Sequence, residues 1–287
     1  MFVVFSLLSK LYMGNIGLCN NAHPLSSCIN ESIESGRSYS EKSISIRDCL
    51  FTRLGVFSGN GGVIMVSIAN FVLNIEKCVF NNNIATNGGS IFFNSYQTVF
   101  KMVCAYKNSA DYSHFAQITV AKNNSIDYLS VSNCSQNLKG DYSLRMNNFH
   151  HFCRFINSSQ NKAKLDSSLI VSVGYILLEF SSIYQNFADN IICYFSGTGS
   201  DLKSVNIIDN NCKTGSVIVA WSGPCKCHHC VFSNNYNCLF FNNLGSLSVF
   251  HSFIYHQNRD VKMTPFINLF NFWGHIGWGF GVKEVKK

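Results

Sequence analysis

The densest group of side chains able to do chemistry in this 287-residue chain is Cys225-Lys226-Cys227-His228-His229-Cys230, with Cys238 nearby. Thiolate and imidazole are ligands that zinc prefers in proteins, which makes this segment a candidate zinc site. Two neighbouring thiols could instead form a local disulfide. The Cys-x-Cys spacing differs from the two-residue gap of structural zinc sites, so we expect these cysteines to be buried as small apolar groups.

A second candidate is the acid pair Asp189 and Asp209, which could meet on neighbouring coils near Asn186 and Asn210. Glycoside hydrolases need two carboxyl groups about 5 to 9.5 Å apart, and calcium-dependent lyases need several acidic oxygens around one ion. The whole chain has only 15 Asp and Glu, and no cluster of acids, or of acids with Arg and Lys, is visible on one strand row. We therefore predict no catalytic residue, no metal ligand and no cofactor site.

Other chemistry-bearing residues carry less information. We expect His150 and His151 to lie on a strand, with one ring inside and one outside. Four glycosylation sequons begin at Asn30, Asn123, Asn133 and Asn157. In a chain this rich in Asn and Ser, chance produces about that many, so they do not predict secretion.

The elements that position these residues follow from an internal repeat. The motif Cys-x-aromatic recurs after β-prone residues, and the first intervals, from Cys49 to Cys78, Cys104 and Cys134, are 29, 26 and 30 residues. Its copies begin at Cys49, Cys78, Cys104, Cys153 and Cys230, and Cys134 fits without the aromatic residue. This pattern predicts that the cysteines stack over one another in a column of buried thiols.

Asparagine follows the aromatic residue, as in Phe80-Asn81-Asn82-Asn83 and Phe232-Ser233-Asn234-Asn235. Two units then carry a glycine pair, Gly61-Gly62-Val63-Ile64 and Gly88-Gly89-Ser90-Ile91. Asn and Gly tolerate the left-handed backbone of tight corners. Stacked Asn side chains can pass amide hydrogen bonds from one unit to the next.

Short alternating apolar segments at this period predict short strands, each half-buried. One unit cannot bury its own inner face, so successive units must stack. With 13% charged residues, 25 Phe and only 3 Pro, the composition fits a β-rich chain and excludes charged helical bundles and collagen. The predicted fold is all-β, a parallel β-helix of about nine coils.

These motifs resemble the repeats of the chlamydial-type polymorphic outer membrane proteins. The resemblance covers roughly residues 44 to 258. The residues that carry it are Phe80 and Asn83, Gly88, Gly89 and Ile91, Gly61, Gly62 and Ile64, and Phe232 and Asn235. It implies a right-handed parallel β-helix displayed at a cell surface, which acts in adhesion or surface interaction.

The resemblance and the absence of a catalytic motif predict a non-enzymatic protein of the cell surface or extracellular space, either secreted or membrane-anchored, whose partner is a protein or glycan ligand. The alternatives are a carbohydrate-active or carbohydrate-binding β-helix protein of the pectin lyase-like type, and a truncated family member without a role of its own. The net charge of +7 comes from scattered basic residues rather than a basic stripe, so we expect no nucleic-acid binding.

The predicted organisation has four parts. Residues 1–18 form a signal peptide or an apolar N-terminal segment, and residues 19–43 an N-terminal cap. Residues 44–258 form the β-helix. Residues 259–287, with Trp273 and Trp278, form a C-terminal cap or a membrane-proximal segment, since the stretch 266–282 is uncharged and precedes the cluster Lys283, Lys286 and Lys287.

Overall fold

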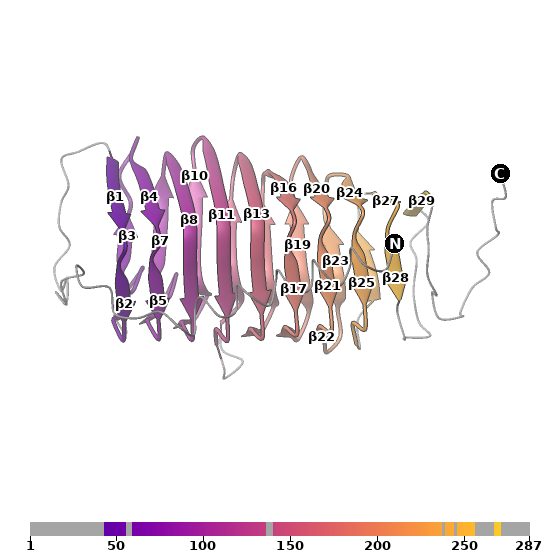
Figure 1. Ribbon diagram of the computed structural model, residues 1–287, viewed down its shortest axis with the longest axis horizontal. Coiled ribbons are helices and arrows are strands. Elements are labelled where there is room, and N and C mark those ends of the chain that lie inside the picture. Colours follow the sequence, from indigo (N-terminus) through magenta and orange to yellow (C-terminus); the bar gives the residue numbers. More distant parts are fainter. Residues whose placement is uncertain are drawn as a thin grey trace.

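The computed structural model describes residues 43–55, 59–135, 140–236, 239–243, 246–255 and 267–270. These residues form strands without helices, and the strands pair in parallel and stack along one long axis (Figure 1). The predicted parallel β-helix is therefore confirmed. Residues 1–42, Cys238 and most of 259–287, with Asn30, Trp273, Trp278 and the terminal lysines, lie outside the described residues.

The largest sheet contains 16 strands. One strand from each successive rung forms its main path: β1 Ser43–Arg47, β4 Val72–Glu76, β8 Gln97–Tyr106, β11 Asn123–Ser132, β13 His150–Ser159, β16 Tyr175–Glu179, β20 Gly199–Lys203, β24 Cys225–His228, β27 Leu247–Phe250 and β29 Ile267–Phe270. The same sheet bends and continues through β2 Leu50–Thr52, β5 Val79–Asn81, β17 Ser182–Tyr184, β21 Asn206–Ile208, β25 Val231–Ser233 and β28 Phe253–Tyr255.

A second sheet of eight strands closes the other side of the coil, and the described chain thus makes about eight complete turns. Its strands are β3 Ile64–Val66, β7 Ile91–Ser95, β10 Ser113–Val120, β12 Tyr142–Asn147, β15 Asp166–Ser172, β19 Ile191–Ser196, β23 Ser216–Ala220 and β26 Leu239–Asn243. Short strands complete the rungs: β6 Ile84–Ala85 with β9 Ser109–Ala110, and β14 Lys162–Ala163 with β18 Phe187–Ala188 and β22 Asn211–Cys212. No helix among the described residues is long and apolar enough to cross a membrane.

The motifs that carry the family resemblance stack in register. Ile64 pairs with Ile91, and the rings of Phe51 and Phe80 stack at 5.0 Å. Gly88 has a φ of 56°, and a Cβ there would lie 2.1 Å from the carbonyl oxygen of Ile91. Glycine is required at this corner because any side chain would collide with the backbone.

The predicted asparagine stack forms a hydrogen-bonded ladder. We call Asn83, Asn108, Asn161, Asn186, Asn210 and Asn235 the asparagine ladder; all six side chains are buried. In each case Nδ2 donates to a backbone carbonyl of the preceding rung, as Asn186 does to Ser158 at 2.9 Å. Each rung corner is thereby tied to its neighbour, and buried backbone groups there gain partners.

The predicted cysteine column is wrong. Only Cys49, Cys78 and Cys230 occupy equivalent inward positions at the start of the second strand segment. Cys104 pairs with Val79 one position later, and Cys153 pairs with Ile126 in the first segment. Cys134 fills the ladder position between Asn108 and Asn161, where its N–H donates to Asn161 Oδ1 at 2.9 Å. Small differences in rung length shift each motif copy relative to its neighbours.

Candidate functional site

Each rung bends at a residue with a left-handed backbone where the first strand segment ends. We call these residues the corner row. All nine have φ between 47° and 59°, and none is glycine: Asp48, Lys77, Met102, Tyr128, Phe155, Phe180, Ser204, His229 and His251. Their side chains point outward, and the exposed fractions of Met102, Tyr128 and Phe180 are 45%, 46% and 40%. Bulky residues rarely adopt this conformation, because their Cβ crowds the following carbonyl.

A second left-handed row lies at the next corner and offers a direct comparison. Its members, which we call the polar row, are Arg53, Asn82, Lys107, Asn133, Gln160, Gln185, Asp209 and Asn234. Both rows share the same backbone conformation and both face outward, yet the polar row contains no apolar residue. The apolar and aromatic side chains of the corner row are therefore not demanded by the backbone geometry.

The aromatic members of the corner row stack along the long axis. The ring centroids of Tyr128 and Phe155 are 4.5 Å apart with an interplanar angle of 6°. Phe155 and Phe180 follow at 5.5 Å and 19°. Because the rungs are about 4.8 Å apart, in-register rings cover one another's faces and expose mainly their edges.

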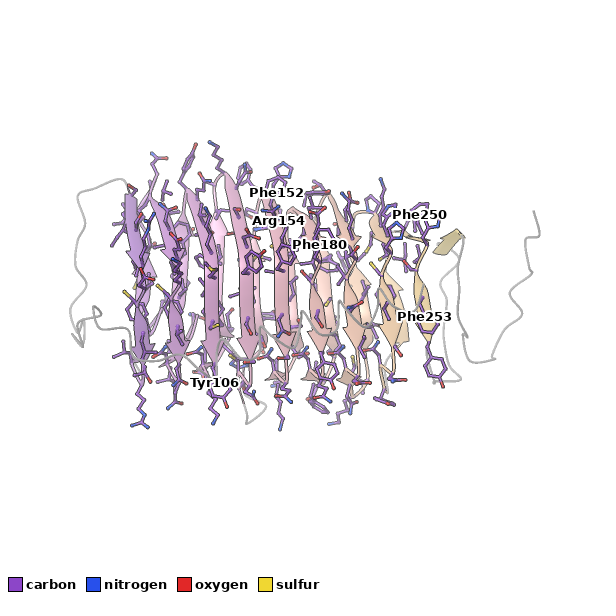
Figure 2. The ribbon with its side chains drawn as sticks, in the orientation of Figure 1. Tyr106, Phe152, Arg154, Phe180, Phe250 and Phe253 are labelled. Atoms are coloured by element: carbon purple, nitrogen blue, oxygen red, sulfur yellow. The ribbon has the colours of Figure 1, made fainter. Side chains whose placement is uncertain are left out.

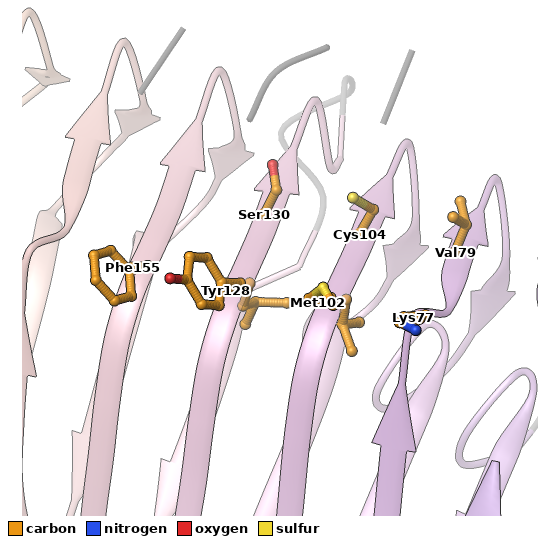
Figure 3. Close-up of a pocket in the computed structure, with 9 residues that line it drawn as sticks. Lys77, Val79, Met102, Cys104, Tyr128, Ser130 and Phe155 are labelled. Atoms are coloured by element: carbon orange, nitrogen blue, oxygen red, sulfur yellow. The ribbon is translucent and has the colours of Figure 1, made fainter. Parts of the chain in front are cut away.

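A groove of about 470 Å³ runs along the corner row on the side of the second strand segment. Figure 3 shows its two rows: Lys77, Met102, Tyr128 and Phe155 on one side, and Val79, Cys104 and Ser130 on the other. The inner wall is completed by Val103 and Leu129. The lining is apolar except for the ammonium of Lys77, the thiol of Cys104 and the hydroxyls of Tyr128 and Ser130.

Charges of alternating sign lie beside the corner row, one residue earlier on each rung. We call Arg47, Glu76, Lys101, Asp127, Arg154, Glu179 and Lys203 the charged row; its members are Cα partners from rung to rung. Ion pairs join Arg47 to Glu76 at 3.2 Å, Arg154 to Asp127 at 3.4 Å and Lys203 to Glu179 at 3.3 Å. Figure 2 shows Arg154 on the outer face between Phe152 and Phe180.

The charged row corrects the expectation that no acids with Arg and Lys project from one strand row. Its acids are nevertheless poorly arranged for hydrolysis. Glu76 and Asp127, or Asp127 and Glu179, stand two rungs apart, about 10 Å, with a cation between them. Paired catalytic carboxyl groups lie about 5 to 9.5 Å apart, with the space between them open to substrate and water. In the charged row, a cation of the intervening rung stands in that space.

Further along the same face, Tyr175 donates a hydrogen bond from its hydroxyl to Asp201 Oδ2 at 2.8 Å. Burial, with the nearby Asp201 and Glu179, raises the pKa of Tyr175 to about 12. His228 lies one rung beyond Asp201. Burial lowers the pKa of His228, and the negative charge of Asp201 acts in the opposite direction. The tyrosine therefore stays protonated at neutral pH and serves as a hydrogen-bond donor.

The Cys225–Cys230 segment does not bring its thiols and imidazoles together. Cys225, Cys227 and Cys230 are buried in the core. His228 lies outside, stacked on Phe250 at 4.5 Å, and His229 lies in the corner row against His251 at 5.3 Å. No group of three or more His, Cys, Asp or Glu within the described ranges is arranged to hold a metal ion.

The three thiols of this segment form no disulfide. Hydrogen bonding with Cys225 and Cys230, together with burial, raises the pKa of the Cys227 thiol. The thiols thus pack as small buried groups, as expected from their place in the repeat.

The acid pair is separated as well. The strand register aligns Asp209 with Gln185 and Asp189 with Lys213, so the two acids lie at opposite ends of a short strand. Asp209 instead faces the hydroxyl of Tyr184. Asn157, one of the four sequon asparagines, is buried at 4% exposure and cannot accept a glycan in the folded chain.

His150 and His151 are arranged as predicted, with His150 outside and His151 fully buried. Asn124 Nδ2 lies 3.4 Å from His151 Nδ1, and His151 Nε2 has no hydrogen-bond partner within the described part of the chain. Burial lowers the pKa of His151 to about 4. This ring is neutral at physiological pH and belongs to the core, not to a surface site.

The corner row, the groove and the charged row were not predicted from the sequence. The signal was present as bulky residues just before each second strand segment, but their alignment depends on the register. Comparison of the chain with protein-family models, curated proteins and solved structures gives no match. The groove and its two flanking rows are therefore the basis for assigning a function.

Proposed function

We propose that this protein is a non-enzymatic interaction protein of the cell surface or extracellular space, and that its ligand binds along the corner row. The observation that carries the proposal is the contrast between the corner row and the polar row. Left-handed backbone at a bulky residue costs of order 1 kcal/mol or more. Met102, Tyr128 and Phe180 retain this cost at exposed positions, and Phe155 at a half-buried one, where the neighbouring corner uses polar residues.

Contiguous exposed apolar side chains beside a groove are typical of binding surfaces. The parallel stack also supports this role, since a rigid rod holds successive corner residues at fixed spacing and presents a long face. The placement at the cell surface rests on the resemblance to the polymorphic outer membrane protein repeats. Adhesion is thus proposed by analogy of fold and repeat, and the binding surface is proposed from geometry.

Two measurements test the proposal. Protease treatment of intact cells that express the C-terminally tagged chain should digest it, and recovery of an intact chain from the cytosol would contradict a surface role. Binding of the purified protein to the surface of cultured cells should fall sharply in the triple variant Met102→Asn, Tyr128→Asn, Phe155→Asn. Asn suits a left-handed backbone, so the fold should persist.

The matched control is Val173→Asn. Val173 is also exposed and left-handed, with a φ of 59°, but it lies at another corner outside the groove. Equal loss of cell binding in the control and in the triple variant would show that the corner row is not the binding surface.

A further inference from the structure

We infer that the groove binds a single unbranched acyl chain with an anionic head group, with the chain along the corner row and the head group at Lys77. This inference rests on the proposed function, because it names the ligand of the same surface. It is drawn from the groove's lining, its length and the position of the one cation that lines it.

The groove spans the four rungs from Lys77 to Phe155, or about 14 Å along the axis. Its volume is about 470 Å³. The groove is therefore long enough for an extended chain that lies along the axis.

An extended peptide is a poor occupant. The backbone groups beside the groove already bond to neighbouring rungs, as in the N–H of Cys104 to the carbonyl of Cys78 at 3.0 Å and the N–H of Val79 to that of Cys49 at 2.8 Å. A peptide backbone would lose its hydration without gaining partners there, which is costly for each buried polar group.

A sugar chain is also disfavoured. Aromatic binding of sugars uses the ring faces, and the faces of Tyr128 and Phe155 already cover each other. Apart from Lys77, only a thiol and two hydroxyls line the groove, too few to satisfy the hydroxyls of a glycan. An alkyl chain needs no hydrogen bonds and buries its surface against Met102, Val79 and the ring edges.

The head group follows from charge. Lys77 is exposed, and it forms no ion pair with any described carboxylate. The neighbouring charged row has four cations and three anions, and its alternation leaves one net positive charge beside the groove. Lys77 is the cation that lines the end of the apolar groove, and it complements a carboxylate head group.

The test uses the full chain and isothermal titration with two probes of equal length, dodecanoate and dodecyltrimethylammonium, each below its micelle concentration. Dodecanoate should bind at one site and more tightly than the cation. Met102→Asn and Tyr128→Asn should each weaken both probes about tenfold. Lys77→Gln should weaken dodecanoate alone, and Val173→Asn should change neither. The NMR signal of the Met102 methyl group should shift on titration.

Several results would overturn the inference. These are no dodecanoate binding, binding unchanged in the Met102 and Tyr128 variants, or a preference for the cation. Tyr128-dependent binding to anionic phospholipid vesicles without binding of free dodecanoate would assign the groove to a bilayer surface instead. If dodecanoate fails to bind while the triple variant still loses cell binding, the acyl ligand is wrong and the proposed binding surface stands. If dodecanoate fails to bind and the triple variant keeps its cell binding, both the acyl ligand and the proposed binding surface are wrong.

Discussion

The side-chain oxygen of Asn210 accepts two hydrogen bonds from Asn186 on the preceding rung, one from its backbone N–H at 2.9 Å and one from its Nδ2 at 3.1 Å. The side-chain oxygen of Asn186 in turn accepts the same pair of hydrogen bonds from Asn161, one rung earlier. One amide group thus links three rungs. Both residues are buried, so water does not reach this corner, and the two amides supply the hydrogen bonds that water would otherwise make.

The first prediction concerns this ladder. Asn186→Ala should lower the free energy of unfolding by about 2 to 4 kcal/mol, because it removes the side-chain partner of the Asn161 N–H and of the Ser158 carbonyl, two buried backbone groups of the preceding rung. Urea unfolding followed by circular dichroism measures the change. Asn74→Ala is the control, since Asn74 lies on the outer face and bonds only weakly to Ser45 at 3.3 Å. Similar losses in both variants would remove the special role of the ladder.

The second prediction concerns the interruption of the ladder at Cys134. Cys134→Asn should raise the free energy of unfolding by about 1 kcal/mol. The new Oδ1 would accept from the N–H of Asn108, and Nδ2 would reach the carbonyl of Ala105, following the pattern of the other rungs. Cys134→Ser, which cannot span both groups, should not stabilise the protein. A destabilised Asn variant would show that the site is too small for the amide.

The third prediction concerns the charged row. A double-mutant cycle of Arg154→Ala and Asp127→Ala should give a coupling of about 0.2 to 1 kcal/mol, because Arg154 is largely exposed and solvent screens the pair. Asp127→Lys should cost more, since it places three cations side by side. Repetition of both measurements in 1 M salt should shrink them. A coupling that salt does not change would argue against an electrostatic origin.

The fourth prediction concerns pH. Burial sets the pKa of His151 near 4, below the unfolded value of about 6.5. The unfolded chain therefore binds the extra proton first, so the contribution is fully present above pH 6.5 and is lost as the pH falls toward 4. The full effect is about 3 kcal/mol. Unfolding by urea at pH 7.5 and 5.0 should show the loss, and His151→Asn should reduce it. An unchanged pH slope in that variant would assign the effect to other groups.

The fifth prediction concerns thiol reactivity. Burial raises the pKa of Cys153, and Cys225 and Cys227 are also enclosed by the core. Iodoacetamide at pH 8 should leave these three thiols unmodified in the folded protein and modify all of them in denaturant, as read by peptide mass spectrometry. Rapid labelling of Cys225 or Cys227 in the native state would mean that this part of the core opens readily.

The sequence by itself determined the type of fold and the most regular contacts. Periodic apolar positions implied stacked half-buried strands, and the Phe-x-x-Asn and Gly-Gly-x-Ile motifs located Phe80, Asn83, Gly88 and Ile91 at positions that stack. These residues are predictable because each answers a local need within its own rung: a buried strand residue, a corner amide, or a backbone without room for a Cβ.

Only the tertiary structure decided which side chains are neighbours across rungs. Rung length varies, from 29 residues between Arg47 and Glu76 to 20 between Phe250 and Phe270, so equal motifs drift apart and unlike residues align. The hydrogen-bond register between strands moved Cys104 and Cys153 out of the expected column. The same register gathered scattered charges into the charged row and aligned Lys77, Met102, Tyr128 and Phe155 beside one groove. Alternation along a strand says which face a residue takes, but only the register between strands says what lies next to it.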